Sequence, residues 1–259
     1  LIELISGQDW DEEIKTKLTM RNARKLHKKF TIMSLREDPD YEEPNILESS
    51  VTAKIPLNLE LRDLNRDKLV LEQLCTKARI PEIIKKIKKI NAKTVIYTEF
   101  VGGRIPEMPT IVDMLKNALD DEKIVHREHT GRDHSGHKAF VENKKIRVLI
   151  ATRPISTGVD DLQDVCNNLI FNNLPWTHAL YTQVIGRLIR KGQKKKVNIH
   201  HVLADVEFDG KIFVYDKRRI DAIINKKNIL DCAVSGVYPE SELVNRDAAL
   251  NQLRRWIEQ

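Results

Sequence analysis

The feature that most constrains the fold is a series of short apolar runs that alternate with segments of helical spacing. Continuous apolar runs of this length are typical of strands that are buried on both faces. Strands separated by helices pair in parallel through right-handed crossovers. The order therefore predicts an α/β domain with an open parallel sheet and helices on both faces. The runs are residues 94–100 (TVIYTEF), 124–128, 146–152 (IRVLIAT), 168–173 (NLIFNN) and 197–203 (VNIHHVL).

Three regions are expected along the chain. Residues 1–66 are interpreted as a linker or accessory segment, residues 67–205 as the α/β domain, and residues 206–259 as a C-terminal helical extension. Pro81 opens one expected helix, because proline fits the first helical turn. Before the α/β domain, we expect a basic helix at 20–30 and a strand at 49–63. Helices are expected within the domain at 81–91, 110–119, 135–142 and 181–193, and after it at 217–228 and 240–258. The 217–228 helix should have Ile220, Ile223 and Ile224 on one face.

The composition favours an intracellular protein with a polyanionic partner. The formal net charge is +6 and charged residues make up 32% of the chain, which is compatible with nucleic-acid binding. Three widely separated cysteines, Cys75, Cys166 and Cys232, indicate unpaired thiols. The sequence shows neither a transmembrane run nor a signal peptide, so we expect a cytoplasmic, nucleoid or nuclear location and no membrane partner. The first residue is not methionine, and we expect a piece of a longer protein.

The segment at residues 181–193 (YTQVIGRLIRKGQ) carries the clearest chemical signal. Helical spacing places Gln183, Gly186, Arg187 and Arg190 on one stripe. Two guanidiniums aimed at one point suit phosphate oxygens, and a glycine inside a helix is usually kept for a close approach. The alternative is an ordinary amphipathic helix with a solvated basic face.

The loops after the expected strands should share one edge of the sheet, where ligands of open parallel sheets gather. These loops are rich in hydroxyls and glycines, which can hold a phosphodiester backbone without reading bases. They are residues 101–106 (VGGRIP), 129–133 (HTGRD) and 152–162 (TRPISTGVDDL), with the hydroxyls of Thr130, Thr152, Ser156 and Thr157.

Residues 151–160 (ATRPISTGVD) and 183–190 (QVIGRLIR) together resemble motifs V and VI of superfamily 2 helicases and translocases. TVIYTEF resembles motif IV, and HTG resembles the short backbone-contacting motif after it. The resemblance covers about residues 93–203 and implies the second RecA-like domain of such a motor. The spacing is closest to the Swi/Snf-type translocases, whose motif positions are taken by Thr152, Arg153, Gly158, Trp176, Gln183, Arg187, Arg190, Gly192 and Gln193.

Several positions depart from the Swi/Snf pattern. Ile155 and Ser156 stand where that pattern has paired glycines, and Thr177-His178 stands where it has Asn-Pro. Gly186 replaces a residue that is commonly acidic in the Swi/Snf pattern, and this change points toward the broader superfamily 2 pattern. The resemblance therefore supports the superfamily more than the subfamily, and chromatin remodelling is not implied.

The resemblance implies a role for each matched residue. Arg190 resembles the arginine finger and Arg187 its companion on the γ-phosphate, and Gln183 would align them. The nucleotide, ATP, would be bound by Gly158, Asp160, Arg187 and Arg190. The nucleic-acid backbone would be contacted by Thr130, Gly131, Thr152 and Arg153.

The 259 residues contain no GxxxxGK[ST] phosphate loop and no DExx acid pair after a strand. The chain is therefore expected to supply arginines to a site whose phosphate loop and Mg²⁺ are held mainly by an N-terminal RecA-like domain of the parent. The parent would hydrolyse ATP, the isolated chain would be inactive, and the polymer would be DNA, with RNA not excluded. The alternative is a non-catalytic nucleic-acid-binding or regulatory module.

Other residues have both a structural and a functional interpretation. His126, His129, His134 and His137 are more simply a solvated loop than metal ligands, and no metal site is predicted. Trp176 favours core packing over base stacking. Lysine runs at 85–89 and 194–196 are most often solvated, although the second follows motif VI, where it could meet a phosphate backbone. One of His200 and His201 is expected to be buried with its hydrogen bonds satisfied.

Overall fold

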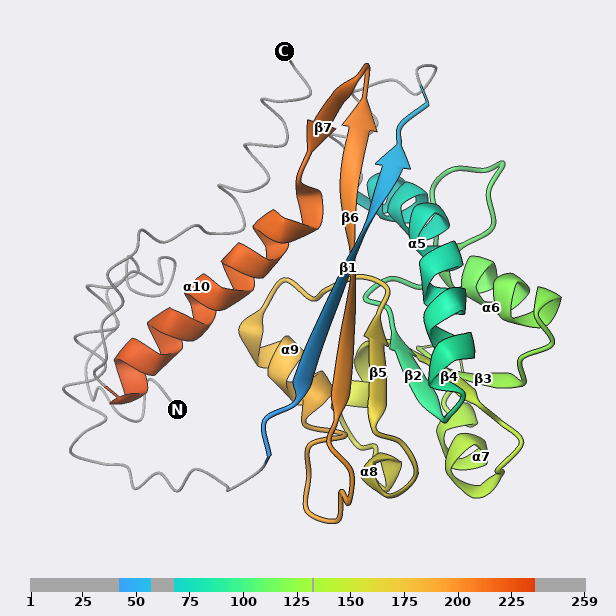
Figure 1. The fold of residues 1–259 in the computed structure, drawn as a ribbon, viewed down its shortest axis with the longest axis vertical. Coiled ribbons are helices and arrows are strands. Elements are labelled where there is room, and N and C mark those ends of the chain that lie inside the picture. Colours follow the sequence, from blue (N-terminus) through green and yellow to red (C-terminus); the bar gives the residue numbers. More distant parts are fainter. Residues whose placement is uncertain (1–41, 57–67, 132, 236–259) are drawn as a thin grey trace.

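The computed structural model describes residues 42–56, 68–131 and 133–235. Within them the chain forms a seven-stranded sheet with helices on both sides (Figure 1). The strands are β1 (Asn45–Lys54), β2 (Thr94–Tyr97), β3 (His126–His129), β4 (Val148–Ala151), β5 (Asn168–Phe171), β6 (Asn198–Phe208) and β7 (Lys211–Phe213). The helices are α5 (Lys68–Ile90), α6 (Ile111–Asp121), α7 (Gly136–Glu142), the 3₁₀ helix η1 (Arg153–Ser156), α8 (Leu162–Val165), α9 (His178–Ile185) and α10 (Tyr215–Ser235). The helices expected at 20–30 and 240–258 lie outside the described residues.

The sheet has the parallel topology that the sequence predicts. Its strand order is β1-β6-β5-β2-β4-β3, with all these pairs parallel, and β7 pairs antiparallel with β6. Thr94 at the start of β2 is in register with Val148 of β4 on one side and Asn168 of β5 on the other. The open α/β fold is confirmed, whereas the sequence pattern does not indicate β7.

The central strands are buried on both faces, which explains their continuous apolar runs. In β2, Val95 and Tyr97 belong to a core formed with α7, α8, α9 and α10. Ile96, between them, belongs to a second core formed with α5 and α6 on the opposite face. Figure 1 shows α9 and α10 on one side of the strands and α5 and α6 on the other.

The sheet extends beyond residues 67–205 at both ends. The strand expected at 49–63 lies at Asn45–Lys54, and it pairs with β6 from Asn45 opposite Asn198 to Lys54 opposite Glu207. Ala53 and Ile55 are buried against α5, β6 and Tyr215. Part of the segment interpreted as a linker thus forms an edge strand of the same sheet.

Helix α5 begins earlier than the sequence indicates. Pro81 lies inside this 23-residue helix, so its expected position in the first helical turn is wrong. A proline inside a helix removes one backbone hydrogen bond, but buried side chains on both sides of Pro81 hold the helix on the sheet. They include Leu71 and Leu74 before it and Ile83 and Ile87 after it.

Helix α10 lies on the α9 side of the sheet and contacts β6 and α9. Ile223 is buried in the core there, but Ile224 is 48% exposed, so the expected shared apolar face is wrong for Ile224. None of the described helices is long and apolar enough to cross a membrane.

Candidate functional site

The carboxyl ends of the central strands lie side by side, as the sequence predicts. The main-chain N–H of Thr98, after β2, donates to Ala151 O at 2.9 Å, and that of Thr152, after β4, donates to His129 O at 3.1 Å. On the other side of β2, Asn172 N donates to Tyr97 O at 2.9 Å. The loops after β2, β3, β4 and β5 therefore leave from one edge, which we call the carboxyl rim.

The four residues expected to contact nucleic acid divide into two kinds at this rim. Thr130 is fully buried and Thr152 is 2% exposed, whereas Gly131 and Arg153 are exposed. Thr152 Oγ1 has no hydrogen-bond partner among the described residues. In this conformation Gly131 and Arg153 are thus accessible to a partner, and the two threonine hydroxyls face the interior.

The loop after β2 is held by a residue that the sequence analysis does not identify. Gln73 of α5 is fully buried, and its Oε1 accepts hydrogen bonds from the main-chain N–H groups of Arg104 at 2.8 Å and Ile105 at 2.9 Å. Its Nε2 donates to Met108 O at 3.2 Å and Pro109 O at 2.8 Å. The Gln73 side chain thus supplies hydrogen bonds to backbone groups of the loop that regular secondary structure would otherwise satisfy.

Helix α9 is shorter than the helix expected at 181–193. It ends at Ile185, and Gly186 is its C-cap with φ −63°. Arg187 and Arg190 lie in the turns that follow, so the predicted helical stripe of four residues is wrong. A Cβ on Gly186 would meet only the carbonyl oxygens of Thr182 and Gln183, and the expected close approach of another segment to this glycine is not found.

Arg187 binds the loop that contains the motif V resemblance. Its Nη1 donates to Val159 O at 2.9 Å and its Nη2 donates to Ser156 O. The side chain is 20% exposed, and Nη1 lies 3.9 Å from Asp160 Oδ1. A planar guanidinium suits this arrangement, because its N–H groups can reach two carbonyls at once. Arg187 therefore fixes the conformation of residues 156–160.

Arg190 forms an ion pair with Asp160, the acid of the motif V resemblance. Both groups are open to solvent, with side-chain exposures of 45% for Arg190 and 64% for Asp160. The main-chain oxygen of Asp160 lies 2.7 Å from His137 Nε2. Exposed pairs of this kind contribute at most about 1 kcal/mol. Arg190 can therefore exchange this carboxylate for another anion at little cost.

Two other residues of the resemblance have clear local roles. Gly158 has φ +69°, a left-handed conformation that glycine adopts without strain, and a Cβ there would meet nothing within 4 Å. Gln193 Nε2 donates to Cys166 O at 3.0 Å and to Leu188 O at 3.3 Å. Gln183 is exposed on α9, and no hydrogen bond of its side chain is found within the described residues.

Trp176 lies in the core, as predicted. It is 8% exposed, and the guanidinium carbon of Arg219 lies 4.3 Å from its ring centroid. Arg219 also donates to Leu174 O at 2.9 Å. The connection between β5 and α9 is therefore fixed by a residue of α10, which lies beyond the resemblance.

Arg219 belongs to a buried ionic cluster that the sequence analysis does not identify. Glu72 and Arg79 of α5 and Asp216 and Arg219 of α10 are each at most 1% exposed. Glu72 pairs with Arg219, and Arg79 pairs with Asp216. Burial opposes the charge of Glu72, but Arg219 and Arg79 outweigh it and lower the pKa of Glu72. The cluster contains two acids and two bases, so its charges are matched.

The two histidines of β6 differ in their hydrogen bonds: His201 forms one through its ring, and His200 forms none among the described residues. Tyr181 Oη lies 3.0 Å from His201 Nε2, and His201 Nδ1 lies 3.5 Å from a carboxylate oxygen of Glu48. His200 is 7% exposed, and its ring nitrogens have no hydrogen-bond partner among the described residues. Burial, with smaller effects of Lys86 and His201, lowers the pKa of His200 to about 4. His201 is thus buried and hydrogen-bonded at Nε2, but its Nδ1 has no hydrogen-bond partner among the described residues, so the expectation of a buried histidine with satisfied hydrogen bonds is met only at Nε2.

Cysteine and histidine side chains give no metal centre in the described part of the chain. No group of three His, Cys, Asp or Glu side chains there is arranged to hold a metal ion. His129 Nδ1 lies 3.1 Å from His134 O, which ties this ring to its own loop. Cys75 and Cys166 are buried free thiols, and burial raises the pKa of Cys166 to about 12.

Part of the chain is similar to known proteins. Residues 76–192 match the family described as "Helicase conserved C-terminal domain". An uncharacterised ATP-dependent helicase, YqhH of Bacillus subtilis (strain 168), is 30% identical over 135 residues, which are 51% of this chain and 22% of the relative. The chain thus spans about a fifth of the length of that relative.

Solved structures with weak overall similarity include two ATPase domains and a DEAD box protein. The C-terminal part of the Fun30 ATPase domain has a TM-score of 0.45 at 17% identity, covering 70% of this chain and 52% of that one. The SWI2/SNF2 ATPase core domain of Sulfolobus solfataricus has a TM-score of 0.42 at 14% identity, covering 62% and 40%. A DEAD box protein from Methanococcus jannaschii has a TM-score of 0.38 at 23% identity, covering 49% and 32%.

The family match contains the motif V and motif VI resemblances and the four strands β2, β3, β4 and β5, together with α9. The sheet that carries them is the open parallel α/β sheet expected of a RecA-like domain. The resemblance to superfamily 2 helicases is thereby confirmed for this part of the chain. Residues 76–192 are thus similar to the helicase conserved C-terminal domain family.

Proposed function

We propose that this chain is the C-terminal motor half of an ATP-dependent nucleic-acid helicase or translocase. In this proposal Arg190 acts as an arginine finger toward ATP that is bound mainly by another RecA-like domain. The phosphate loop and the Mg²⁺ ligands belong to that other domain. The observation that carries the proposal is the exposed Arg190–Asp160 pair, held at the junction of the motif V and motif VI segments.

The chemistry of the pair supports this assignment. Phosphoryl transfer spreads negative charge over the equatorial oxygens of the γ-phosphate, and a permanently charged guanidinium stabilises it. Arg190 is accessible and its present partner is an exposed carboxylate, so it can reach a phosphate without leaving an uncompensated buried charge. Asp160 would then be free to accept hydrogen bonds from the ribose hydroxyls.

Arg187 has a different proposed role. Its guanidinium already donates to Val159 O and Ser156 O, so we assign it to positioning the Gly158–Asp160 loop. The positive φ of Gly158 supports this assignment, because it gives the loop a left-handed turn that glycine adopts without strain. Direct contact of Arg187 with the γ-phosphate would require the loss of both carbonyl contacts. Gln183, exposed on the same helix, remains available to align the nucleotide-proximal groups.

We propose the carboxyl rim as the track for the nucleic-acid strand. Gly131 and Arg153 are exposed there and would contact the phosphodiester backbone. Thr130 and Thr152 are buried in this conformation, so their hydroxyls would support the loops unless the rim opens on binding. DNA is the proposed polymer, because the Thr152-Arg153 pair and the Trp176 spacing resemble those of Swi/Snf-type DNA translocases.

ATP hydrolysis measured with and without DNA tests this proposal. The longer protein that the proposal requires should hydrolyse ATP, and DNA should stimulate it. The 259-residue chain alone should show negligible turnover, because it supplies only one wall of the site. Robust turnover by this chain alone would show that the nucleotide site is complete within it. No DNA stimulation of the longer protein would exclude a DNA-driven motor.

A further inference from the structure

We propose that residues 191–196, here called the basic loop, bind the phosphate backbone of nucleic acid at a second contact, separate from the carboxyl rim. This inference deepens the proposed function, because it assumes that nucleic acid is the partner. The loop has the sequence KGQKKK, with four lysines and no acidic residue. It follows the turns after α9 and leads directly into β6, so it lies at the end of the sheet where the strands begin.

The basic loop differs in charge from the loops of the carboxyl rim. At the carboxyl rim, Arg104 and Arg153 are accompanied by Glu99 and Glu107 in the loops after β2 and β4. The charged residues of the basic loop are all lysines. Affinity for nucleic acid depends mainly on positive groups that neutralise phosphates and release counterions. By this criterion the basic loop is the stronger phosphate-binding feature of the two.

Most lysines of the basic loop have unpaired charges. Lys191, Lys194 and Lys195 are exposed and form no ion pair within the described residues, while Lys196 pairs with Glu42 at 3.4 Å. The lysine run of α5 is different. There Lys85 pairs with Glu82 at 3.3 Å and Lys88 pairs with Glu122 at 2.6 Å. A free lysine binds a phosphate without first breaking an ion pair.

The backbone of the basic loop is ordered by Gln193. Besides its bonds to Cys166 O and Leu188 O, Gln193 accepts through Oε1 from Lys195 N at 3.0 Å. Asn167 Nδ2 donates to Lys196 O at 2.9 Å, which fixes the end of the loop. A loop that is ordered before binding loses less conformational entropy when it meets its partner. The lysines are thus presented on a fixed backbone.

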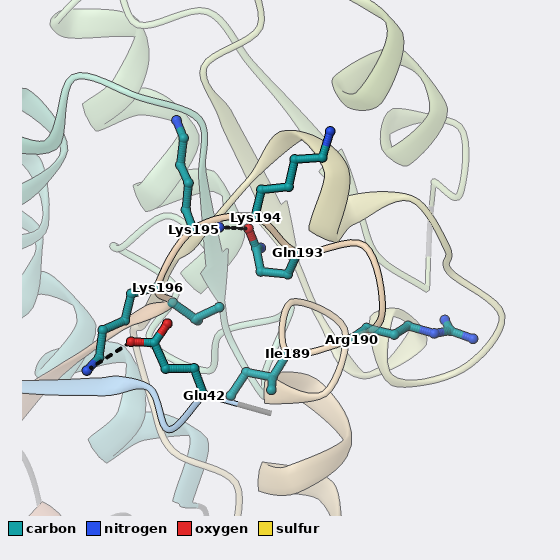
Figure 2. A pocket seen from close by; sticks show the side chains of 8 residues that line it. Glu42, Ile189, Arg190, Gln193, Lys194, Lys195 and Lys196 are labelled. Carbon is teal, nitrogen blue, oxygen red and sulfur yellow. Dashed lines mark hydrogen bonds and ion pairs between the residues drawn. The ribbon is translucent and has the colours of Figure 1, made fainter. Parts of the chain in front are cut away.

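The shape of this surface favours an extended polyanion over a small anion. Two pockets, of about 140 Å³ and 260 Å³, are both lined by Gln193, Lys194 and Lys195. The larger one is also lined by Asp164, whose carboxylate disfavours a phosphate inside it. Figure 2 shows Lys194 and Lys195 pointing away from the Lys196–Glu42 pair, so the ammonium groups do not converge on one point. Separated ammonium groups match successive phosphates along a strand.

The test is the salt dependence of binding between the 259-residue chain and labelled DNA, measured by fluorescence anisotropy on one duplex and one single-stranded oligonucleotide. The double variant Lys194→Gln/Lys195→Gln removes two free lysines. The matched control, Lys85→Gln/Lys88→Gln, removes the same charge from α5. Thermal unfolding of each variant checks that the fold is retained.

We expect the slope of log affinity against log salt to become less steep by about 1.8 for duplex DNA, or about 1.4 for single-stranded DNA, in the basic-loop variant. The control should keep the wild-type slope. Equal slopes for wild type and the basic-loop variant, or an equal change in the control, would overturn the second contact while leaving the proposed motor function intact. If the wild-type chain binds neither oligonucleotide, the second contact fails, and the ATPase measurement decides the motor function separately.

Discussion

At the scale of single residues, the loop after β2 depends on the close approach of Gln73 to Gly103. A Cβ built on Gly103 would lie 2.5 Å from Gln73 Nε2 and 2.8 Å from its Oε1. Gln73 cannot move aside easily, because both of its polar atoms bind the loop backbone. Gly102, the preceding residue, differs: its Cβ would make only an ordinary contact, 3.7 Å from a methyl group of Leu69.

Gly103→Ala should therefore destabilise the protein by about 2 kcal/mol, the usual effect of overpacking a site that cannot relax. Gly102→Ala is the matched control and should change the free energy of unfolding by less than about 0.5 kcal/mol. Urea denaturation of the two variants and the wild type measures the difference. Equal stabilities of the two variants would mean that Gln73 does not constrain this loop.

At the scale of whole elements, α10 is joined to α5 by the buried cluster of Glu72, Arg79, Asp216 and Arg219. The helix contributes Asp216 and Arg219, and Asp216 Oδ2 also accepts from Ala204 N of β6 at 2.7 Å. Tyr215 Oη donates to Glu72 at 2.9 Å. Helix α10 is thus attached to α5 and β6 by buried charged groups.

Removing one partner of such a pair leaves the other charge buried and unpaired. Arg219→Met should lower the free energy of unfolding by about 3 to 5 kcal/mol. Glu72→Gln/Arg219→Met should lose much less than the sum of the two single variants, because neither charge is then left alone. Denaturant unfolding of the four proteins in this cycle measures the coupling. Additive losses would show that Glu72 and Arg219 do not stabilise α10 as a pair.

The elements differ in how far their sequences reveal them. β2, β4 and β5 could be predicted because both of their faces are buried, which leaves continuous apolar runs. The start of α5 and the end of α9 could not be predicted from the sequence. Pro81 is tolerated because of tertiary packing, and α9 ends where Arg187 turns to bind Val159 O, a contact between residues 28 positions apart.

The candidate site shows the same division. The order and spacing of the motif resemblances lie within short segments, so Asp160, Arg187 and Arg190 could be identified from sequence. The polar residues that hold the site could not, because their partners are distant in sequence. Gln73 binds residues more than 30 positions away, and Glu72 pairs with Arg219 across 147 positions. The pattern of residues within a short segment does not indicate pairs that are so far apart in sequence.

At the scale of the whole molecule, the described residues form one RecA-like sheet, and the segment similar to the helicase C-terminal domain family lies at its centre. Arg190 sits on its surface, balanced by Asp160 and open to a further anion. In the proposed function a second domain therefore brings the phosphates of ATP to this arginine. The other residues of the site, Arg187 and Gly158, determine the conformation of residues 156–160, which include the Asp160 partner of Arg190.

The most direct test is DNA-stimulated ATP hydrolysis by the longer protein that carries Arg190→Ala. Loss of an arginine finger should reduce turnover by about 10³-fold or more without unfolding the domain. Arg127→Ala is the control, since Arg127 is an exposed arginine that donates to the main chain of its neighbour His126. Wild-type turnover in the control and a large loss in Arg190→Ala are the predicted results. Near-normal hydrolysis by Arg190→Ala would contradict the arginine-finger assignment.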